Sequence, residues 1–202
     1  MIRLVTAGGR GGFTLVELMV AIAIGGVLLT ATYELLNTNS KLYYSKENTM
    51  VMTQDLRAAT DILVRELRMA GCNPTGAGGI GFQNDTSATL IHFTMDFDGD
   101  GATTGTNEEI EYYIYSQNQI QSLGRRTGGA VGLVAEYITA LAFVYYDSTG
   151  AAFTPASATD FNNIFAVDIS ITAETPKADA ITLAKKTDSM TTRVRIRNAG
   201  LQ

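Results

Sequence analysis

The chain has one cysteine, one histidine, three prolines and no tryptophan among its 202 residues. A single cysteine excludes an internal disulfide framework and any zinc site built from several cysteines. A single histidine excludes histidine-rich metal sites and triad arrangements of the usual kind. The sequence also lacks the glycine-rich phosphate loop and the short signatures of zinc proteases and serine hydrolases. We therefore expect a protein that is not an enzyme.

Charge is also scarce. Charged residues make up 17% of the chain, and 15 Lys and Arg against 20 Asp and Glu give a net charge of −5. Soluble domains usually carry about 25% charged residues. Because nucleic-acid binding needs a phosphate-neutralising basic surface, we expect no nucleic-acid partner. The 46% of apolar residues is too high for a disordered chain, so the protein should fold.

The first third of the sequence contains a long apolar run. Residues 1–12 hold two arginines, four glycines and no acid, which is typical of a leader rather than of a folded segment. From Phe13 to Tyr33 there are 21 residues, and Glu17 is the only charged one. As a helix this run is about 32 Å long, close to the roughly 30 Å hydrocarbon thickness of a bilayer. It predicts a membrane-spanning segment over about 13–36.

Glu17 is an acid inside this apolar run. A carboxylate at mid-bilayer costs about 2.5 to 3.5 kcal/mol, less toward the interface, and such a residue usually has a functional partner. If the chain is cut between Gly12 and Phe13, the new α-amino group lies one helical turn from Glu17. The amine could belong to the same copy or to a neighbouring one. The alternative is an ordinary secretory signal cut near Thr30 and Ala31, but in such signals the small residues follow the apolar region, whereas here the glycine pair precedes it.

The run from Gly12 to Glu17, GFTLVE, followed by LMVAIAI, resembles the prepilin leader shared by type IV pilins and the pseudopilins of type II secretion. The resemblance implies cleavage after Gly12 by a membrane-embedded prepilin peptidase and N-methylation of Phe13. It also implies that the apolar helix is retained as the assembly core of a filament. In that family the glutamate equivalent to Glu17 contacts the amino terminus of the adjacent subunit.

Helical periodicity continues beyond the apolar run. Apolar residues recur at spacings of three and four, which predicts an amphipathic helix with one buried face. The residues are Met52, Leu56, Ala59, Leu63, Leu67 and Ala70. Gly71 and then Pro74 predict the end of this helix, as a glycine cap and a helix breaker. The sequence thus predicts one long helix over residues 13–71.

After a glycine-rich connection the pattern changes to short alternating segments rich in β-branched and aromatic residues, which predict strands. These segments are residues 88–95, 109–116, 139–147, 164–172 and 191–198. Hairpin-like connections favour an antiparallel sheet with one face packed on residues 50–70 of the helix. We therefore expect an α+β, pilin-like fold with a globular domain over 80–202.

The second half of the chain narrows the resemblance. The segments RMAGCNP, EIEYYIY, ITALAFVYYDSTG and RVRIRN, in this order, are similar to those of PilW-type minor pilins and, more distantly, of minor pseudopilins. The lack of a helical proline between Phe13 and Met69 and of a second cysteine departs from the pattern of major pilins.

This resemblance implies a minor type IV pilin that primes or caps a filament of major and minor pilins. It would be held in the inner membrane by a single span, with its carboxyl-terminal domain in the periplasm, and lie in the pilus at the cell surface after assembly. The alternatives are a minor pseudopilin of a type II secretion system and, in another class, a membrane-anchored calcium-dependent adhesin or binding module.

An acidic segment provides a candidate metal site. Residues 96–101, DFDGDG, match the first half of a calcium loop, with acids at positions one, three and five and the turn glycine at six. Calcium prefers six to eight oxygen ligands, so more donors are needed. The predicted ligands are Asp96, Asp98, Asp100, the carbonyl of Ala102, and Glu108. The alternative is an acidic turn that only reverses the chain.

Three further features receive structural interpretations. Arg193, Arg195 and Arg197 alternate with apolar residues, as on the solvated face of an edge strand, although a docking stripe would have the same pattern. His92 has no neighbour in the sequence that suggests acid–base chemistry, and no role is assigned to it. Cys72 is expected to be a buried small apolar residue.

Overall fold

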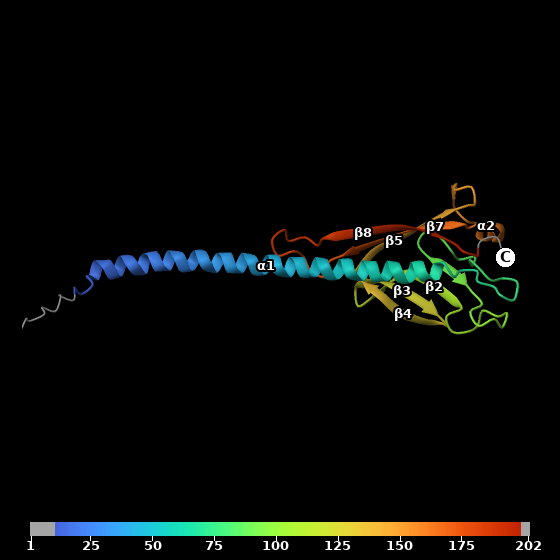
Figure 1. The fold of residues 1–202 in the computed structure, drawn as a ribbon, viewed down its shortest axis with the longest axis horizontal. Coiled ribbons are helices and arrows are strands. Elements are labelled where there is room, and N and C mark those ends of the chain that lie inside the picture. The colour runs from blue at the N-terminus through green and yellow to red at the C-terminus, as the bar shows by residue number, and fades with distance from the viewer. Residues whose placement is uncertain (1–10, 199–202) are drawn as a thin grey trace, which may run out of the picture. The chain divides into compact units, whose positions relative to one another are not determined.

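The computed structural model describes residues 11–198. Within these residues the chain forms one long helix, eight strands and one short helix, arranged as Figure 1 shows. The elements are α1 (Leu15–Leu67), β1 (Ile91–Thr94), β2 (Glu109–Gln117), β3 (Ile120–Thr127), β4 (Ala130–Glu136), β5 (Ile138–Tyr146), β6 (Ala152–Phe153), α2 (Ala158–Asn162), β7 (Ala166–Glu174) and β8 (Thr187–Arg195). The chain divides into two compact units, Met1–Tyr44 and Ser45–Gln202, and α1 contributes to both.

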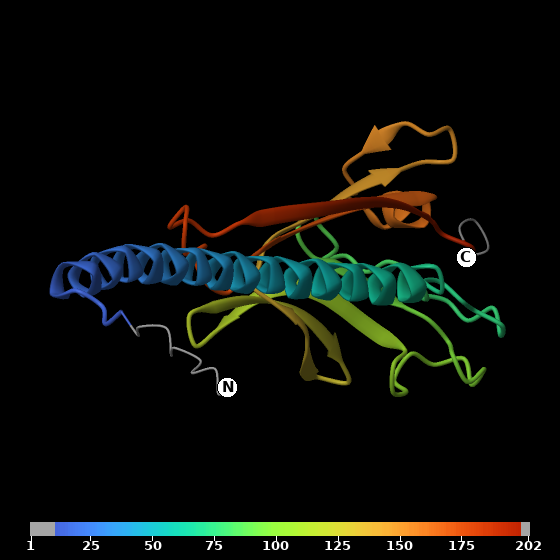
Figure 2. The same cartoon turned by 60° about the vertical axis from the view of Figure 1, so that its left-hand side comes forward.

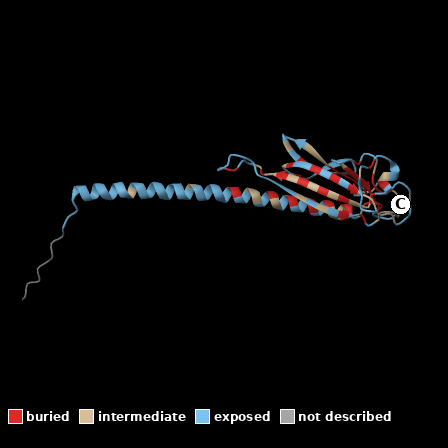
Figure 3. Ribbon diagram, turned by 90° about the horizontal axis from the view of Figure 1, so that it is seen from above, coloured by how far each residue is buried: buried red, intermediate tan, exposed pale blue. Residues whose placement is uncertain are grey.

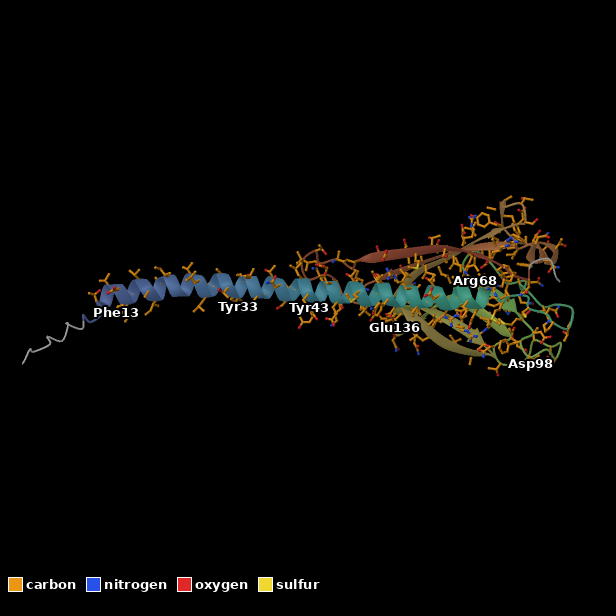
Figure 4. The ribbon with its side chains drawn as sticks, in the orientation of Figure 1. Phe13, Tyr33, Tyr43, Arg68, Asp98 and Glu136 are labelled. Atoms are coloured by element: carbon orange, nitrogen blue, oxygen red, sulfur yellow. The ribbon has the colours of Figure 1, made fainter. Side chains whose placement is uncertain are left out.

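The first unit contains the amino-terminal part of α1. None of the described residues before Ser45 is buried, and the apolar side chains are largely exposed, as the pale blue colour of this segment shows in Figure 3. Figure 4 shows the side chains of Phe13, Tyr33 and Tyr43 projecting outward from this part of the chain. By length and composition α1 is apolar enough to cross a membrane. The predicted apolar segment thus forms a helix whose apolar surface is not covered within its own unit.

Hydroxyl groups in this part of α1 are hydrogen-bonded within the helix. Thr30 Oγ1 donates to the carbonyl of Gly26 at 2.9 Å, and Thr32 Oγ1 donates to the carbonyl of Leu28 at 2.8 Å. Such bonds satisfy a hydroxyl without help from water. The threonines therefore add little polar surface to a segment that would enter a bilayer.

In the second unit the remainder of α1 packs into the core. The buried apolar residues of this part follow the predicted periodicity: Met52, Leu56, Ala59, Leu63 and Leu67, with Ala70 beyond the helix end. The helix ends at Leu67, and residues 68–71 continue as a turn. Gly71 has a φ of 70°, and its amide donates to the carbonyl of Thr94 at 3.0 Å. The glycine therefore redirects the chain toward β1.

The strands form two antiparallel four-stranded sheets, in the orders β1-β2-β3-β4 and β6-β5-β7-β8. Figures 1 and 2 show the two sheets on opposite sides of the carboxyl-terminal half of α1. One core joins the helix with both sheets, and it includes Leu63, Ile91, Leu123, Ile169 and Val194. The α+β layout of a long amino-terminal helix followed by antiparallel sheets is as predicted, but two sheets, rather than one, cover the helix.

The change of sheet occurs between β4 and β5. A single residue, Tyr137, separates the two strands, and its φ of 59° turns the chain sharply. Ile138, the next residue, is fully buried. Strand β4 was not predicted because Gly132 interrupts a short segment in which Val131 and Leu133 are both exposed. The segment therefore lacks the alternation of apolar and polar residues from which β1, β2, β5, β7 and β8 were predicted, and alternation did not predict β3 or β6 either.

Candidate functional sites

The predicted processing site lies at the start of the described chain. Gly12 is exposed and unhindered, since a Cβ added to it would meet no atom within 4 Å. Phe13 is 86% exposed. Residues 1–10 of the predicted leader lie outside the described part of the chain. The structure thus presents the Gly12–Phe13 bond in an accessible segment just before the helix.

Glu17 lies in the first turn of α1. Its backbone amide donates to Thr14 Oγ1 at 3.2 Å, so Thr14 acts as a helix cap. Within residues 11–198 no cationic group forms an ion pair with the Glu17 carboxylate. In the uncleaved chain the nitrogen of Phe13 is an uncharged amide. The acid is therefore exposed and available to an amine that cleavage would create.

The acidic segment forms the loop between β1 and β2, where Figure 4 labels Asp98. Asp96, Asp98, Asp100 and Glu108 each offer one oxygen, and these oxygens all lie within 4.8 Å of one another. Asp96 and Glu108 are 1% exposed, whereas Asp98 and Asp100 are exposed. The structure thus brings together the four predicted carboxylates. Ala102 enters the cluster through its amide, which donates to Asp100 Oδ1 at 2.7 Å.

The two buried carboxylates also hold the loop together. Asp96 Oδ1 accepts from the amide of Gly99 at 2.7 Å, and Asp96 Oδ2 accepts from Thr75 Oγ1 at 2.9 Å and from the amide of Gly101 at 3.1 Å. Glu108 accepts from the amides of Phe97, Asp98 and Gly105. These bonds also fit the alternative interpretation, an acidic turn whose side chains cap backbone amides.

The electrostatics of Asp96 favour its ionised form. Burial raises the pKa of this carboxyl, but the hydrogen bonds from the Thr75 hydroxyl and from the loop amides lower it more. The net result is a pKa below the ordinary value. Within residues 11–198, no lysine or arginine forms an ion pair with any of the four carboxylates. The loop thus gathers several acids without a cation of the described chain beside them.

Of the three arginines predicted for the last strand, Arg193 and Arg195 lie in β8 and are engaged within their own unit, whereas Arg197 lies beyond the end of this strand. Arg193 makes a double hydrogen bond to Asp168, at 2.6 and 2.8 Å, and lies 3.9 Å from the centre of the Tyr146 ring. Arg195 lies 4.4 Å from the centre of the Phe165 ring. These contacts favour the structural interpretation of these two arginines over a docking stripe.

Cys72 is half-buried and packs against the core, which favours its structural interpretation as a small apolar residue.

A family model described as the prokaryotic N-terminal methylation motif matches residues 8–33. A comparison with curated proteins finds no match to the chain. The matched range includes Gly12, Phe13 and Glu17 and most of the exposed apolar segment. It supports a type IV pilin or pseudopilin-like protein, and it suggests a structural rather than an enzymatic subunit. The motif implies processing by prepilin peptidase and assembly with other pilins, and together with the apolar helix it fits a pilin anchored in the inner membrane.

The low pKa of Asp96 leads to a pH-dependent stability. Because this pKa is lower in the folded chain than in the unfolded one, ionised Asp96 stabilises the fold above its unfolded pKa of about 4. The contribution is lost as the pH falls through the folded pKa. We expect the free energy of unfolding of the wild type to fall more steeply than that of Asp96→Asn between about pH 5 and pH 3.

The measurement is urea denaturation of the full chain in non-ionic micelles with a chelator present, followed by circular dichroism. Thr75→Val removes one of the bonds that lower the pKa of Asp96, so it should move the loss of stability to higher pH. Parallel pH profiles for the wild type and Asp96→Asn would contradict the assignment.

Proposed function

We propose that this protein is a minor subunit of a type IV pilus, made as a prepilin and assembled into the filament through its amino-terminal helix. The observation that carries the proposal is the exposed apolar part of α1, with Glu17 as its first acid, because most of this segment lies within the matched methylation motif of residues 8–33. In the proposed organisation residues 1–12 are the leader, residues 13–71 the retained helix, and residues 80–202 the globular domain.

The exposed apolar segment supports an assembly role. Contiguous apolar surface of this extent is rare on soluble monomers and marks contact with lipid or with another protein. Lipid would cover it before assembly, and the helices of neighbouring subunits would cover it in the filament. Glu17 is costly in lipid, and pairing with the methylated amine of Phe13 in an adjacent subunit would offset that cost. The acid would thereby set the register between subunits.

Two features of the chain support a minor rather than a major subunit. The helix contains no proline between Phe13 and Met69, and Cys72 has no second cysteine with which to form a disulfide loop. A minor pseudopilin of a type II secretion system is the second candidate, because the matched motif is common to pilins and pseudopilins. In either case we propose that the globular domain lies in the periplasm before assembly.

A substitution of Glu17 tests the assembly role. Glu17→Ala should leave cleavage and membrane insertion intact, because it removes the lipid penalty of the acid, but it should reduce incorporation into sheared filaments by about tenfold or more, as expected when a charge pair in a low-dielectric contact is lost. Immunoblots of sheared filaments and of inner membrane measure the two pools.

Glu34→Ala is the matched control, since it removes another exposed carboxylate from the same helix. It should assemble as the wild type does. If Glu17→Ala is incorporated into filaments as well as the wild type is, this acid is not a docking group. That result would favour an adhesin in which the helix is only an anchor.

We also propose that the loop of Asp96, Asp98, Asp100 and Glu108 binds calcium. Four carboxylates whose oxygens lie within 4.8 Å of one another repel, and a divalent cation offsets that repulsion while using the oxygen ligands that calcium prefers. Water and loop carbonyls would complete the coordination. The loop joins β1 to β2, so a bound ion would order the connection between two strands of one sheet.

Calcium should raise the melting temperature of the full chain in micelles. An ion that binds only the folded chain adds about 2.7 kcal/mol of stability at a free concentration one hundred times the Kd. The double variant Asp98→Asn with Asp100→Asn should lose this gain, while Asp61→Asn, on the exposed face of α1, should keep it. Identical melting with millimolar calcium and with chelator would leave the acidic turn as the correct interpretation.

A further inference from the structure

His92 lies at the centre of a second cluster of acidic groups, on the other face of the β1-β2 ladder from the core. It is the direct cross-strand partner of Glu111, and Glu109 is two residues earlier on the same face of β2. Asp85 reaches the same place from the segment before β1. His92 Nδ1 lies 2.6 Å from Asp85 Oδ1 and 3.9 Å from Glu111 Oε1, and His92 Nε2 lies 3.2 Å from Glu109 Oε1.

The imidazole is enclosed. Its side chain is 10% exposed, and the segment that carries Asp85 is held over it by Thr86, whose hydroxyl accepts from the amide of His92 at 3.1 Å and donates to its carbonyl at 2.8 Å. His92 Nε2 is buried and has no hydrogen-bond partner in the described chain, because Glu109 is near but poorly aligned. A buried ring nitrogen without a partner is costly and calls for an explanation.

The charges of the cluster are out of balance. Asp85, Glu109 and Glu111 contribute three negative charges, and the side chain of Glu111 is only 5% exposed. Arg126, the cross-strand neighbour of Glu111 on β3, forms an ion pair with it and is the only arginine or lysine of residues 11–198 that pairs with the cluster. Buried carboxylates are stable only when paired or bound to a metal. A divalent cation would balance the two negative charges that remain after Arg126 is counted.

We propose that Asp85, His92 and Glu111 form a binding site for a transition-metal ion of the zinc class. Their ligand atoms all lie within 4.8 Å of one another. Zinc–nitrogen and zinc–oxygen bonds of about 2.0–2.2 Å require donor atoms about 3.3 Å apart in a tetrahedral site. The separations of 2.6 and 3.9 Å from His92 Nδ1 lie on either side of this value. Modest side-chain shifts would bring the three donors into place.

The donor set selects the metal. A ring nitrogen with two carboxylate oxygens suits zinc and its neighbours, whereas calcium and magnesium take oxygen ligands. Three protein ligands leave a fourth position, which water can fill because Asp85 and Glu109 are about half exposed at the rim. This site is therefore distinct in chemistry from the all-oxygen loop of Asp96.

Binding at Nδ1 also explains the unpartnered nitrogen. A metal at Nδ1 displaces the proton there, so the remaining ring proton is on Nε2. A small shift of the half-exposed Glu109 side chain, whose Oε1 lies 3.2 Å away, would align its carboxylate with this proton. Metal-ligating histidines usually donate their second N–H to a carboxylate in this way. Glu109 is thus a positioning residue. The bound ion would tie the segment of Asp85 to strands β1 and β2.

Arg126 provides an independent test because it competes with the metal for Glu111 Oε1. We expect Arg126→Gln to bind zinc more tightly than the wild type, by about tenfold, because Arg126 is half exposed and a unit positive charge about 5 Å from a divalent ion costs about this much at the dielectric of water. Asp85→Asn and His92→Gln should each weaken binding by about tenfold or more, and Glu109→Gln should have a smaller effect. Asp98→Asn, in the calcium loop, should leave zinc binding unchanged.

The experiment uses the full chain in micelles, stripped with chelator and titrated with Zn²⁺ alone, with calorimetry and melting temperature as readouts. Cobalt titration adds visible absorption bands whose intensity reports the coordination geometry of the bound ion. One ion per chain, weakened by Asp85→Asn and strengthened by Arg126→Gln, supports the site. Asp85 is half exposed, so its variant should fold even if His92→Gln does not. Absence of binding by the wild type, or binding that Asp85→Asn and Arg126→Gln leave unchanged, overturns the proposal.

Discussion

The constraint on which the structure depends is an apolar helical segment that its own unit does not cover. Before Ser45 no described residue is buried, although large apolar side chains occupy most positions from Phe13 to Leu36. Burial of such side chains is worth about 1.5–3 kcal/mol each, so lipid or neighbouring helices must supply the missing contacts. The second unit meets the opposite condition, because its own two sheets bury the apolar face of α1 from Met52 onward.

The sequence alone predicted most of this difference between the two parts of α1. Uncharged residues from Leu18 to Tyr33 and the spacing of Met52, Leu56 and Leu63 distinguish a uniformly apolar helix from an amphipathic one. Local alternation also predicted β1, β2, β5, β7 and β8, but it missed β3, β4 and β6. The division of the strands into two sheets was not predicted, because it depends on the turn at Tyr137. There a positive φ, at a residue with no special turn tendency, redirects the chain. Local sequence patterns indicate which residues are buried, but they do not indicate which sheet or helix buries them.

The same limit of local sequence patterns applies to the candidate sites. The spacing of Asp96, Asp98 and Asp100 is local, so the sequence predicted their convergence, and Glu108 joins them across the loop. The cluster around His92 was missed because strand pairing assembles it. Only the register that places His92 opposite Glu111 brings the imidazole beside the acids. One available signal was the alternation of Glu109 and Glu111, which places two acids on the same face of a strand.

The central claim is that the apolar helix is kept in the mature protein and begins at a free amine beside Glu17. Mass spectrometry of the amino-terminal peptide from the membrane or filament fraction tests it most directly. The account predicts a chain that starts at N-methylated Phe13, and uncleaved precursor when Gly12 is replaced by valine. A mature chain that starts near Thr32, after removal of the apolar segment, would contradict the account, because the described part of the chain has no second helix apolar enough to cross a membrane.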